Sequence, residues 1–172
     1  LDSTGVITDE IGYVSTDTYF SGSEISQFNR PFDISIGTND SVWVVDSTNQ
    51  RVQHFDKNGD YIEHINMSEN MVPTGIDIDG ENLYVTFYDD NYANHIYNYS
   101  TTNIIDGKAT IKAIYDGYKE ARDIDVDDGI FWIVDYLNHK VVRAVRNGTF
   151  EMTKELNIGK TNDDGDIVST NG

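Results

Sequence analysis

The chain has 172 residues, of which 30 are acidic and 12 basic, giving a formal net charge of −18, and it contains no cysteine. Such a negative field repels nucleic-acid phosphates and anionic lipid headgroups, so neither nucleic acid nor a lipid surface is an expected partner. No apolar run approaches the roughly 20 residues that cross a bilayer, and the lack of cysteine excludes a disulfide-stapled ectodomain. The composition fits an exported protein stabilised by sheet packing.

The segment from Phe28 to Ile62 holds four short runs rich in Val, Ile, Tyr and Trp, separated by turn residues. Short β-branched and aromatic runs bounded by Asn, Asp and Gly are typical of strands. Degraded copies of this segment follow twice. The first strand of each copy lies at residues 31–36, 73–78 and 121–126. An aromatic-bearing strand comes next, at residues 42–45, 83–86 and 131–134.

The repeat has a period that identifies its architecture. Equating Ile34, Ile76 and Ile124 gives steps of 42 and 48 residues. This range is typical of four-stranded propeller blades, and no window shows a sustained helical period. Asx-Gly pairs that suit tight hairpins occur at 58–59, 79–80, 128–129 and 147–148. The sequence therefore predicts an all-β chain of β-propeller blades, each a four-stranded antiparallel sheet, with Trp43, Tyr84 and Trp132 in the core between sheets.

A polar signature follows each aromatic strand. It reads Asp-Ser-Thr-Asn-Gln-Arg-Val at 46–52 and Asp-Tyr-Leu-Asn-His-Lys-Val at 135–141, and it is blurred at 90–96. The order of first strand, Asp-Gly turn, aromatic strand and Asp-x-x-Asn-x-Arg/Lys-Val resembles the NHL repeat. The resemblance covers roughly residues 28–150 and implies a propeller of about six blades.

The register divides the whole chain into blades. Residues 1–12 resemble the end of a preceding blade, residues 13–65, 66–115 and 116–158 three blades, and residues 159–172 a link to a following blade. About three blades do not close a ring, and a propeller buries its sheet edges only when the ring is complete. Either the chain is a piece of a longer polypeptide or several copies assemble. The absence of an initiator Met favours the first alternative.

The acidic residues concentrate in turns such as 123–129 and 162–166. Asp and Asn alternating near Gly resemble half of a calcium loop, but neither segment supplies the full spacing with a terminal Glu. The favoured interpretation is a solvent-facing strand followed by a hairpin, and calcium stays an alternative. No cofactor is otherwise expected.

Groups suited to catalysis are scarce. The histidines fall in different copies, at His54, His64, His95 and His139, whereas zinc needs three or four converging ligands. They are interpreted as structural, and no metal site is assigned. The sets Asp46/Asn49/Arg51 and Asp135/Asn138/Lys140 are also interpreted as structural, because the Asp can cap turn amides and pair with the basic residue.

Sequons for N-glycosylation begin at Asn39, Asn66, Asn98 and Asn147. Each is expected on a turn, a strand end or a link, where a glycan projects into solvent. Asn66 and Asn98 are the preferred sites, because Asn39 precedes an acidic residue and Asn147 opens a turn.

Aromatic residues in predicted loops suggest a surface for a sugar or a protein. The candidates are Tyr19, Phe20, Tyr88 and Tyr92. The sequence thus favours a non-enzymatic structural or binding module of an exported, glycosylated cell-surface or extracellular assembly. Its expected partners are protein, carbohydrate, further blades or other copies. The alternative is part of a propeller lyase or hydrolase whose metal site is completed by missing blades.

Overall fold

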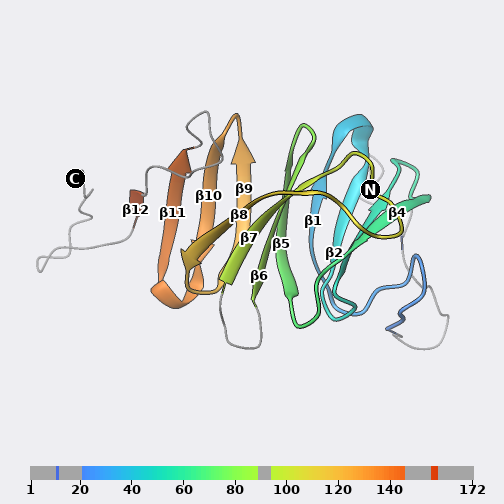
Figure 1. Cartoon of the computed structure of the whole chain (residues 1–172), viewed down its shortest axis with the longest axis horizontal. Coiled ribbons are helices and arrows are strands. Elements are labelled where there is room, and N and C mark those ends of the chain that lie inside the picture. Colours follow the sequence, from blue (N-terminus) through green and yellow to red (C-terminus); the bar gives the residue numbers. More distant parts are fainter. Residues whose placement is uncertain (1–10, 12–20, 89–93, 146–155, 159–172) are drawn as a thin grey trace, which may run out of the picture.

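The computed structural model describes residues 11, 21–88, 94–145 and 156–158. These residues form three antiparallel four-stranded sheets that follow one another along the chain (Figure 1). The elements of the described part are strands and two 3-10 turns, η1 (Thr38–Asp40) and η2 (Tyr136–Asn138). The predicted all-β fold of four-stranded antiparallel blades is confirmed.

The first blade contains, in spatial order, β1 (Pro31–Ile36), β2 (Val42–Asp46), β3 (Arg51–Phe55) and β4 (Tyr61–Asn66). The second blade contains β5 (Val72–Asp79), β6 (Asn82–Tyr88), β7 (Asn94–Ser100) and β8 (Ile111–Tyr118). The third blade contains β9 (Ala121–Asp127), β10 (Ile130–Asp135), β11 (Lys140–Val145) and β12 (Leu156–Ile158). The blade boundary predicted at residues 115 and 116 falls inside β8, which continues to Tyr118.

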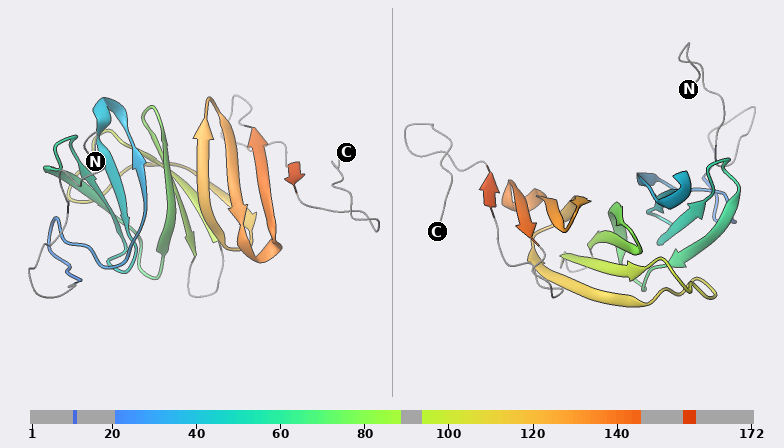
Figure 2. Two further views of the ribbon diagram at one scale, coloured as in Figure 1. Left: turned by 180° about the vertical axis from the view of Figure 1, so that it is seen from behind. Right: turned by 90° about the horizontal axis from the view of Figure 1, so that it is seen from above.

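The blades stand side by side around an open arc, with β1, β5 and β9 on its inner side and β4 and β8 on its outer side (Figure 2). Each blade therefore has two faces. We call the face toward the preceding blade in chain order the leading face, and the face toward the next blade the trailing face.

The second blade shows how the period of two divides a strand between these faces. Along β6, Leu83, Val85 and Phe87 are buried against the first blade. Tyr84 is buried against the third blade. This continuous apolar run is a strand covered on both faces.

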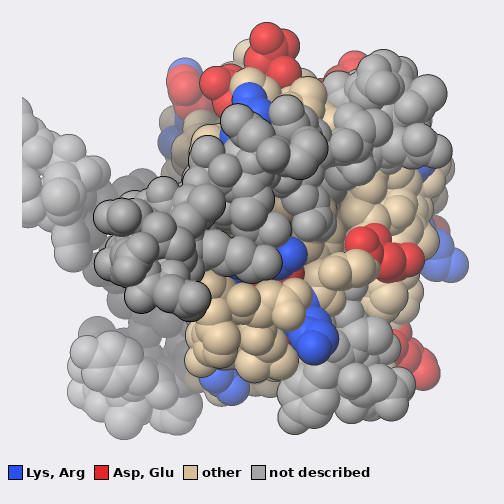
Figure 3. All heavy atoms as spheres, turned by 90° about the vertical axis from the view of Figure 1, so that its left-hand side faces the viewer, with Lys and Arg blue, Asp and Glu red and all other residues tan. Residues whose placement is uncertain are grey.

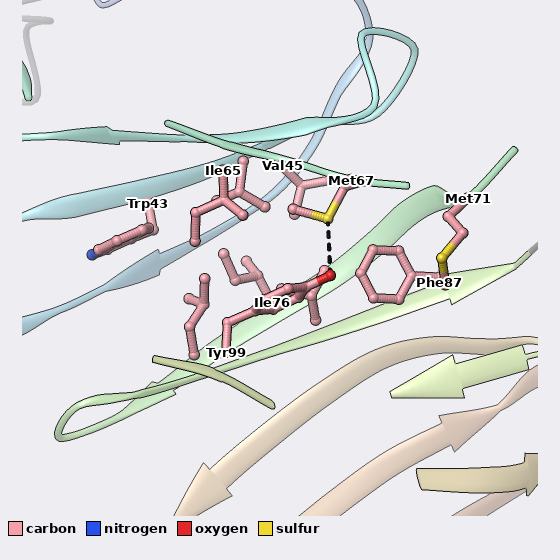
Figure 4. Close-up of a cluster of buried hydrophobic side chains, with 11 residues drawn as sticks. Trp43, Val45, Ile65, Met67, Met71, Ile76, Phe87 and Tyr99 are labelled. Atoms are coloured by element: carbon pink, nitrogen blue, oxygen red, sulfur yellow. Dashed lines mark hydrogen bonds between the residues drawn. The ribbon is translucent and has the colours of Figure 1, made fainter. Parts of the chain in front are cut away.

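The core between the first two blades joins the trailing face of one to the leading face of the next (Figure 4). Trp43, Val45 and Ile65 of the first blade meet Ile76 and Phe87 of the second. Two methionines of the link between the blades, Met67 and Met71, fill the same core, and Met67 Sδ lies 3.8 Å from the Tyr99 hydroxyl.

The core between the second and third blades repeats this plan. Tyr84 packs edge-on against Phe131 with ring centroids 5.1 Å apart. Ile124 and Val126 of β9 complete the contact from the third blade. The inter-sheet positions predicted for Trp43 and Tyr84 are confirmed.

Gly75 lets the inner strands of these two blades approach closely. A Cβ atom added to Gly75 would lie 2.7 Å from Asp123 Cα and 2.9 Å from the Arg122 carbonyl oxygen. Beside it, the Thr74 hydroxyl donates to the Ala121 carbonyl across the interface at 3.1 Å. Contacts with backbone atoms leave no room for a side chain here.

The hairpin at Asp128 and Gly129 has the predicted turn chemistry. Both residues have positive φ, 47° and 73°, which matches the two central positions of a type I′ turn. The predicted hairpin at residues 147–148 lies outside the described residues. Within the described residues, no helix is long and apolar enough to span a membrane.

Candidate functional site

The first repeat signature forms a buried polar network around Asp46. Its carboxylate is fully buried and accepts hydrogen bonds from the Asn29 backbone at 2.7 Å, the Asn49 amide at 2.9 Å and Arg51 Nε at 2.7 Å. The predicted pairing of this aspartate with the basic residue of its signature is confirmed. The network fixes the turn between β2 and β3.

Arg51 uses the rest of its guanidinium to hold the segment before β1. Nη1 donates to the Ser23 carbonyl at 2.9 Å, and Nη2 donates to the carbonyls of Glu24 at 2.7 Å and Gln27 at 2.8 Å. Residues 21–29 are thereby tied over the leading face of the first blade, where Phe28 packs 5.8 Å from Phe55.

The third blade contains a lighter version of this network. Asp135 is fully buried and accepts from Asn138 Nδ2 and from the Lys119 backbone, each at 2.8 Å. Lys140 Nζ lies 3.6 Å from the same carboxylate, too far for a strong hydrogen bond. The middle signature is interrupted by residues 89–93, which lie outside the described residues.

Carboxylates of the inner strands join neighbouring blades. Asp33 accepts from the Ile76 backbone at 2.9 Å, and Asp77 accepts from the Val126 backbone at 2.6 Å. Burial raises the pKa of Asp33, and the negative charge of Asp123 raises it further. The pKa of Asp125 is also raised by burial and then by its acidic neighbours. The inner acidic residues thus repel one another while holding the blades together.

The histidines lie in separate environments. His54 stacks on Trp43 with ring centroids 3.8 Å apart, and burial lowers the pKa of His54. His64 Nδ1 lies 2.6 Å from the Tyr61 hydroxyl, and His95 pairs with the Asp116 carboxylate. His139 ends η2 in the left-handed conformation.

The candidate metal ligands of the sequence are the histidines and the acidic turns. In the described ranges no group of three or more His, Cys, Asp or Glu residues is arranged to hold a metal ion. Asp123, Asp125 and Asp127 face solvent along β9, as the favoured interpretation of that acidic segment predicted. The acidic turn at 162–166 lies outside the described residues.

The predicted glycosylation sites differ in accessibility. Asn39 on η1 and Asn66 at the end of β4 are exposed. Asn98 lies inside β7, pairs with Tyr84 and Ala113 on the neighbouring strands, and is fully buried. The expectation that Asn98 occupies a turn or strand end is therefore wrong, because β7 runs from Asn94 to Ser100 and is paired on both sides at Asn98. Asn147 lies outside the described residues.

Tyr88 is the one predicted binding aromatic within the described residues, since Tyr19, Phe20 and Tyr92 fall outside them. It is half-buried at the end of β6 and lines a cavity of about 410 Å³. The cavity lies where the three blades meet at the start of their inner strands, and Arg30 and Arg122 also line it. Sequence reasoning missed these arginines, although basic residues are scarce and both lie at the start of an inner strand.

The two ends of the arc leave packing positions uncovered. Trp132 is 37% exposed, whereas its register equivalents Trp43 and Tyr84 are 2% and 0% exposed. The expectation that Trp132 lies in the inter-sheet core is wrong for this chain, because no described blade follows the third. On the surface seen in Figure 3, basic and acidic side chains are interspersed with uncharged ones. Arg143 lies 6.0 Å over the Trp132 ring.

The leading face of the first blade is covered by residues 21–29 near β3 but is open along β1. Ile34 is 59% exposed, while its equivalents Ile76 and Ile124 are 3% and 4% exposed at the two internal interfaces. Phe32 and Ile36 of the same strand are also exposed. The described chain therefore ends in a trailing face that is uncovered at Trp132 and a leading face that is uncovered along β1.

Comparison with known proteins identifies the repeat. The family model of the NHL repeat matches residues 28–55, which include β1, β2 and β3. No curated protein sequence matches the chain.

A solved structure shares the fold. The chain is similar to the crystal structure of a protein of unknown function from Bacteroides caccae, with a TM-score of 0.50 and 12% sequence identity. The alignment covers 80% of this chain and 51% of that chain, so the present chain spans about half the length of its structural neighbour. At this identity the similarity concerns the fold alone.

The Asp46 network leads to a stability prediction. Asp46→Ala is expected to lower the free energy of unfolding by about 3–5 kcal/mol, because it leaves the buried Arg51 guanidinium without its counter-charge. Chemical denaturation measures the change. Asp60→Ala, which removes an exposed carboxylate near the next hairpin, is the control and should change stability by less than about 0.5 kcal/mol. Equal stability of the two variants would contradict the structural role of Asp46.

The inner carboxylates lead to a pH prediction. The pKa of Asp33 is higher in the folded protein than in the unfolded chain. Between these two pKa values the folded protein therefore binds more protons than the unfolded chain. This group therefore lowers stability as pH rises through that interval, and the penalty is complete above it. Asp33→Asn is expected to stabilise the protein more at pH 7 than at pH 4, as measured by urea unfolding at each pH. Asp40→Asn, an exposed site on η1, should show no such increase.

The sequons lead to a glycosylation prediction. When the chain is secreted by a eukaryotic host, we expect a glycan on Asn66 and none on Asn98, because a glycan at a buried strand position prevents the blade from closing. Site-resolved mass spectrometry measures occupancy. Ser68→Ala and Ser100→Ala are matched variants that abolish one sequon each and keep its Asn. Only Ser68→Ala should reduce the glycan mass, and a loss with Ser100→Ala would refute the assignment.

Proposed function

We propose that this chain, which has an NHL-repeat match and blades of the β-propeller type, serves as a non-enzymatic structural and binding module of an exported, glycosylated cell-surface or extracellular assembly. The observation that carries the proposal is the pair of uncovered faces at the two ends of the arc. Exposed apolar faces of this kind are typical of surfaces that bind another protein.

The two open faces are complementary because the chain already packs such faces together twice. Each internal interface contains an aromatic residue from one blade and an isoleucine from the next in the same core. Trp43 and Ile76 share the first core, and Tyr84 and Ile124 share the second. Trp132 presents the aromatic half of this interface, and Ile34 presents the aliphatic half. A trailing face of one molecule therefore fits the leading face of another.

The occupant that we propose is a second copy of this chain, bound head to tail. Two arcs joined through two such interfaces give a ring with six blades and no open end, which satisfies the need of a propeller to cover its faces.

Export and glycosylation rest on composition and exposure. The net charge of −18 opposes binding to nucleic acid and to anionic membranes. Asn39 and Asn66 stand exposed on the surface, where a glycan would not disturb an interface between blades of one chain.

Oligomeric state tests the assembly. Light scattering after size exclusion is expected to give twice the 19.4 kDa chain mass. Ile34→Asp and Trp132→Asp are each expected to yield monomers, because a carboxylate would be buried in both interfaces of the ring. Ile105→Asp is the control, since Ile105 is 68% exposed between β7 and β8 and lies on neither end face.

Mixing the variants distinguishes a head-to-tail contact from any other dimer. The Ile34→Asp chain keeps an intact Trp132 face, and the Trp132→Asp chain keeps an intact Ile34 face. Their mixture should therefore form a heterodimer through one native interface, although neither variant associates alone. A wild-type chain that is monomeric at every concentration, or a mixture that stays monomeric while both variants remain folded, would overturn the assembly.

A further inference from the structure

A cavity of about 410 Å³ opens where the three blades meet, at the start of β1, β5 and β9. This volume is within the range of small-molecule pockets, about 300–1,000 Å³. Its walls come from all three blades, so it exists only in the assembled fold. It belongs to a single chain, and of the residues named at the end faces only Phe32 also lines it.

The charged residues that line the cavity are opposite in sign to the net charge of the chain. The chain carries a net charge of −18, yet Arg30 and Arg122 line this cavity and none of its described lining residues is acidic. Among the described residues Arg30 has no ion-pair partner, and its side chain is exposed. Arg30 therefore brings an uncompensated positive charge to the cavity, while Arg122 brings a guanidinium that also pairs with Glu120.

The backbone of Arg30 is held in an unfavourable conformation. Its φ of 56° lies in the left-handed region, which costs a residue with a Cβ about 1–2 kcal/mol. Hydrogen bonds to the β2–β3 turn maintain it, since the Ser47 backbone donates to the Arg30 carbonyl at 3.4 Å and the Thr48 backbone donates to the Asn29 carbonyl at 3.1 Å. Strain maintained in this way is a feature of ligand sites, and here it positions a cation at the cavity.

Arg122 is oriented before any ligand arrives. Its Nη2 donates to the Glu120 carboxylate, and its guanidinium lies 4.6 Å over the Tyr136 ring. Its Nε is buried and has no hydrogen-bond partner within the described residues. The guanidinium is thus held in place, and a ligand carboxylate can pair with the terminal N–H donors that Glu120 leaves unused.

The remaining lining adds groups that suit a sugar. Thr48 and Gln50 bring a hydroxyl and an amide from the β2–β3 turn, while Tyr88 and Phe32 bring aromatic surface from two blades. Hydroxyl and amide groups can pair with sugar hydroxyls, and aromatic rings can pack on the apolar face of a pyranose. Two arginines beside them select a carboxylate, because guanidinium and carboxylate pair through two parallel hydrogen bonds.

We propose that this cavity, with Arg30 and Arg122 as its anion-binding residues, binds an acidic saccharide through the carboxylate of a uronic acid unit. Thr48, Gln50 and Tyr88 orient the sugar ring. The association is non-covalent and requires no chemistry from the chain.

Calorimetric titration of the full chain with trigalacturonate tests the site, and neutral galactotriose is the uncharged control ligand. Trigalacturonate is expected to bind and galactotriose is not. Arg30→Gln should weaken binding about tenfold or more, which is the loss expected from one hydrogen-bonded ion pair. Arg122→Lys should weaken it as well, because lysine keeps the charge near Glu120 but cannot form the bidentate pair.

Lys57→Gln provides the matched control for loss of one positive charge. Lys57 is exposed in the β3–β4 hairpin, at the opposite end of β3 from Gln50, and its loss should leave the affinity unchanged. Circular dichroism establishes that each variant is folded. Undiminished binding by Arg30→Gln, or equal binding of galactotriose, would overturn the site. Equal binding of a tetraglutamate peptide would overturn the assignment to a saccharide.

Discussion

The contact between the trailing face of one blade and the leading face of the next is the interaction on which the rest of this structure depends. A single four-stranded sheet leaves two apolar faces open to water, and only another blade covers them with matching side chains. The second blade demonstrates the consequence, because β6 is buried on both sides, with Val85 facing one neighbour and Tyr84 the other. Among the described residues, the first and third blades each have one such neighbour, so apolar side chains stay exposed along β1 and at Trp132.

Polar groups serve this packing. The Asp46 network closes the turn between β2 and β3 and, through Arg51, ties the incoming segment to the first blade. Asp33 and Asp77 each accept a backbone hydrogen bond from the next blade, which fixes the offset between inner strands. The acidic character of the inner strands has an electrostatic cost, visible in the raised pKa of Asp33. The cavity that Arg30 and Arg122 line lies at the start of the inner strands β1, β5 and β9. Its geometry therefore follows from the packing of the blades.

The candidate sites were predictable to different degrees. Tyr88 was identified from its place in an irregular signature, and the structure places it in the cavity. The arginines beside it were not identified, because Arg30 and Arg122 are 92 positions apart in a chain of 172 and converge only when the first and third blades flank the second. Asn98 was misassigned for a related reason. A sequon reports local composition, whereas burial depends on the strands that pair on either side.

The sequence by itself determined the blade. Its period, its Asx-Gly turns and the alternation within each strand are local properties, and they specify which residues pair and which side chains share a face. Only the tertiary structure decided how equivalent positions differ. Trp43 and Trp132 have the same register and the same chemistry, yet one is 2% and the other 37% exposed, since burial depends on whether another blade is present. The physical reason is that strands close together in the sequence form the hydrogen bonds within each sheet. Whether a face of that sheet is buried depends instead on how many blades there are and in what order they pack.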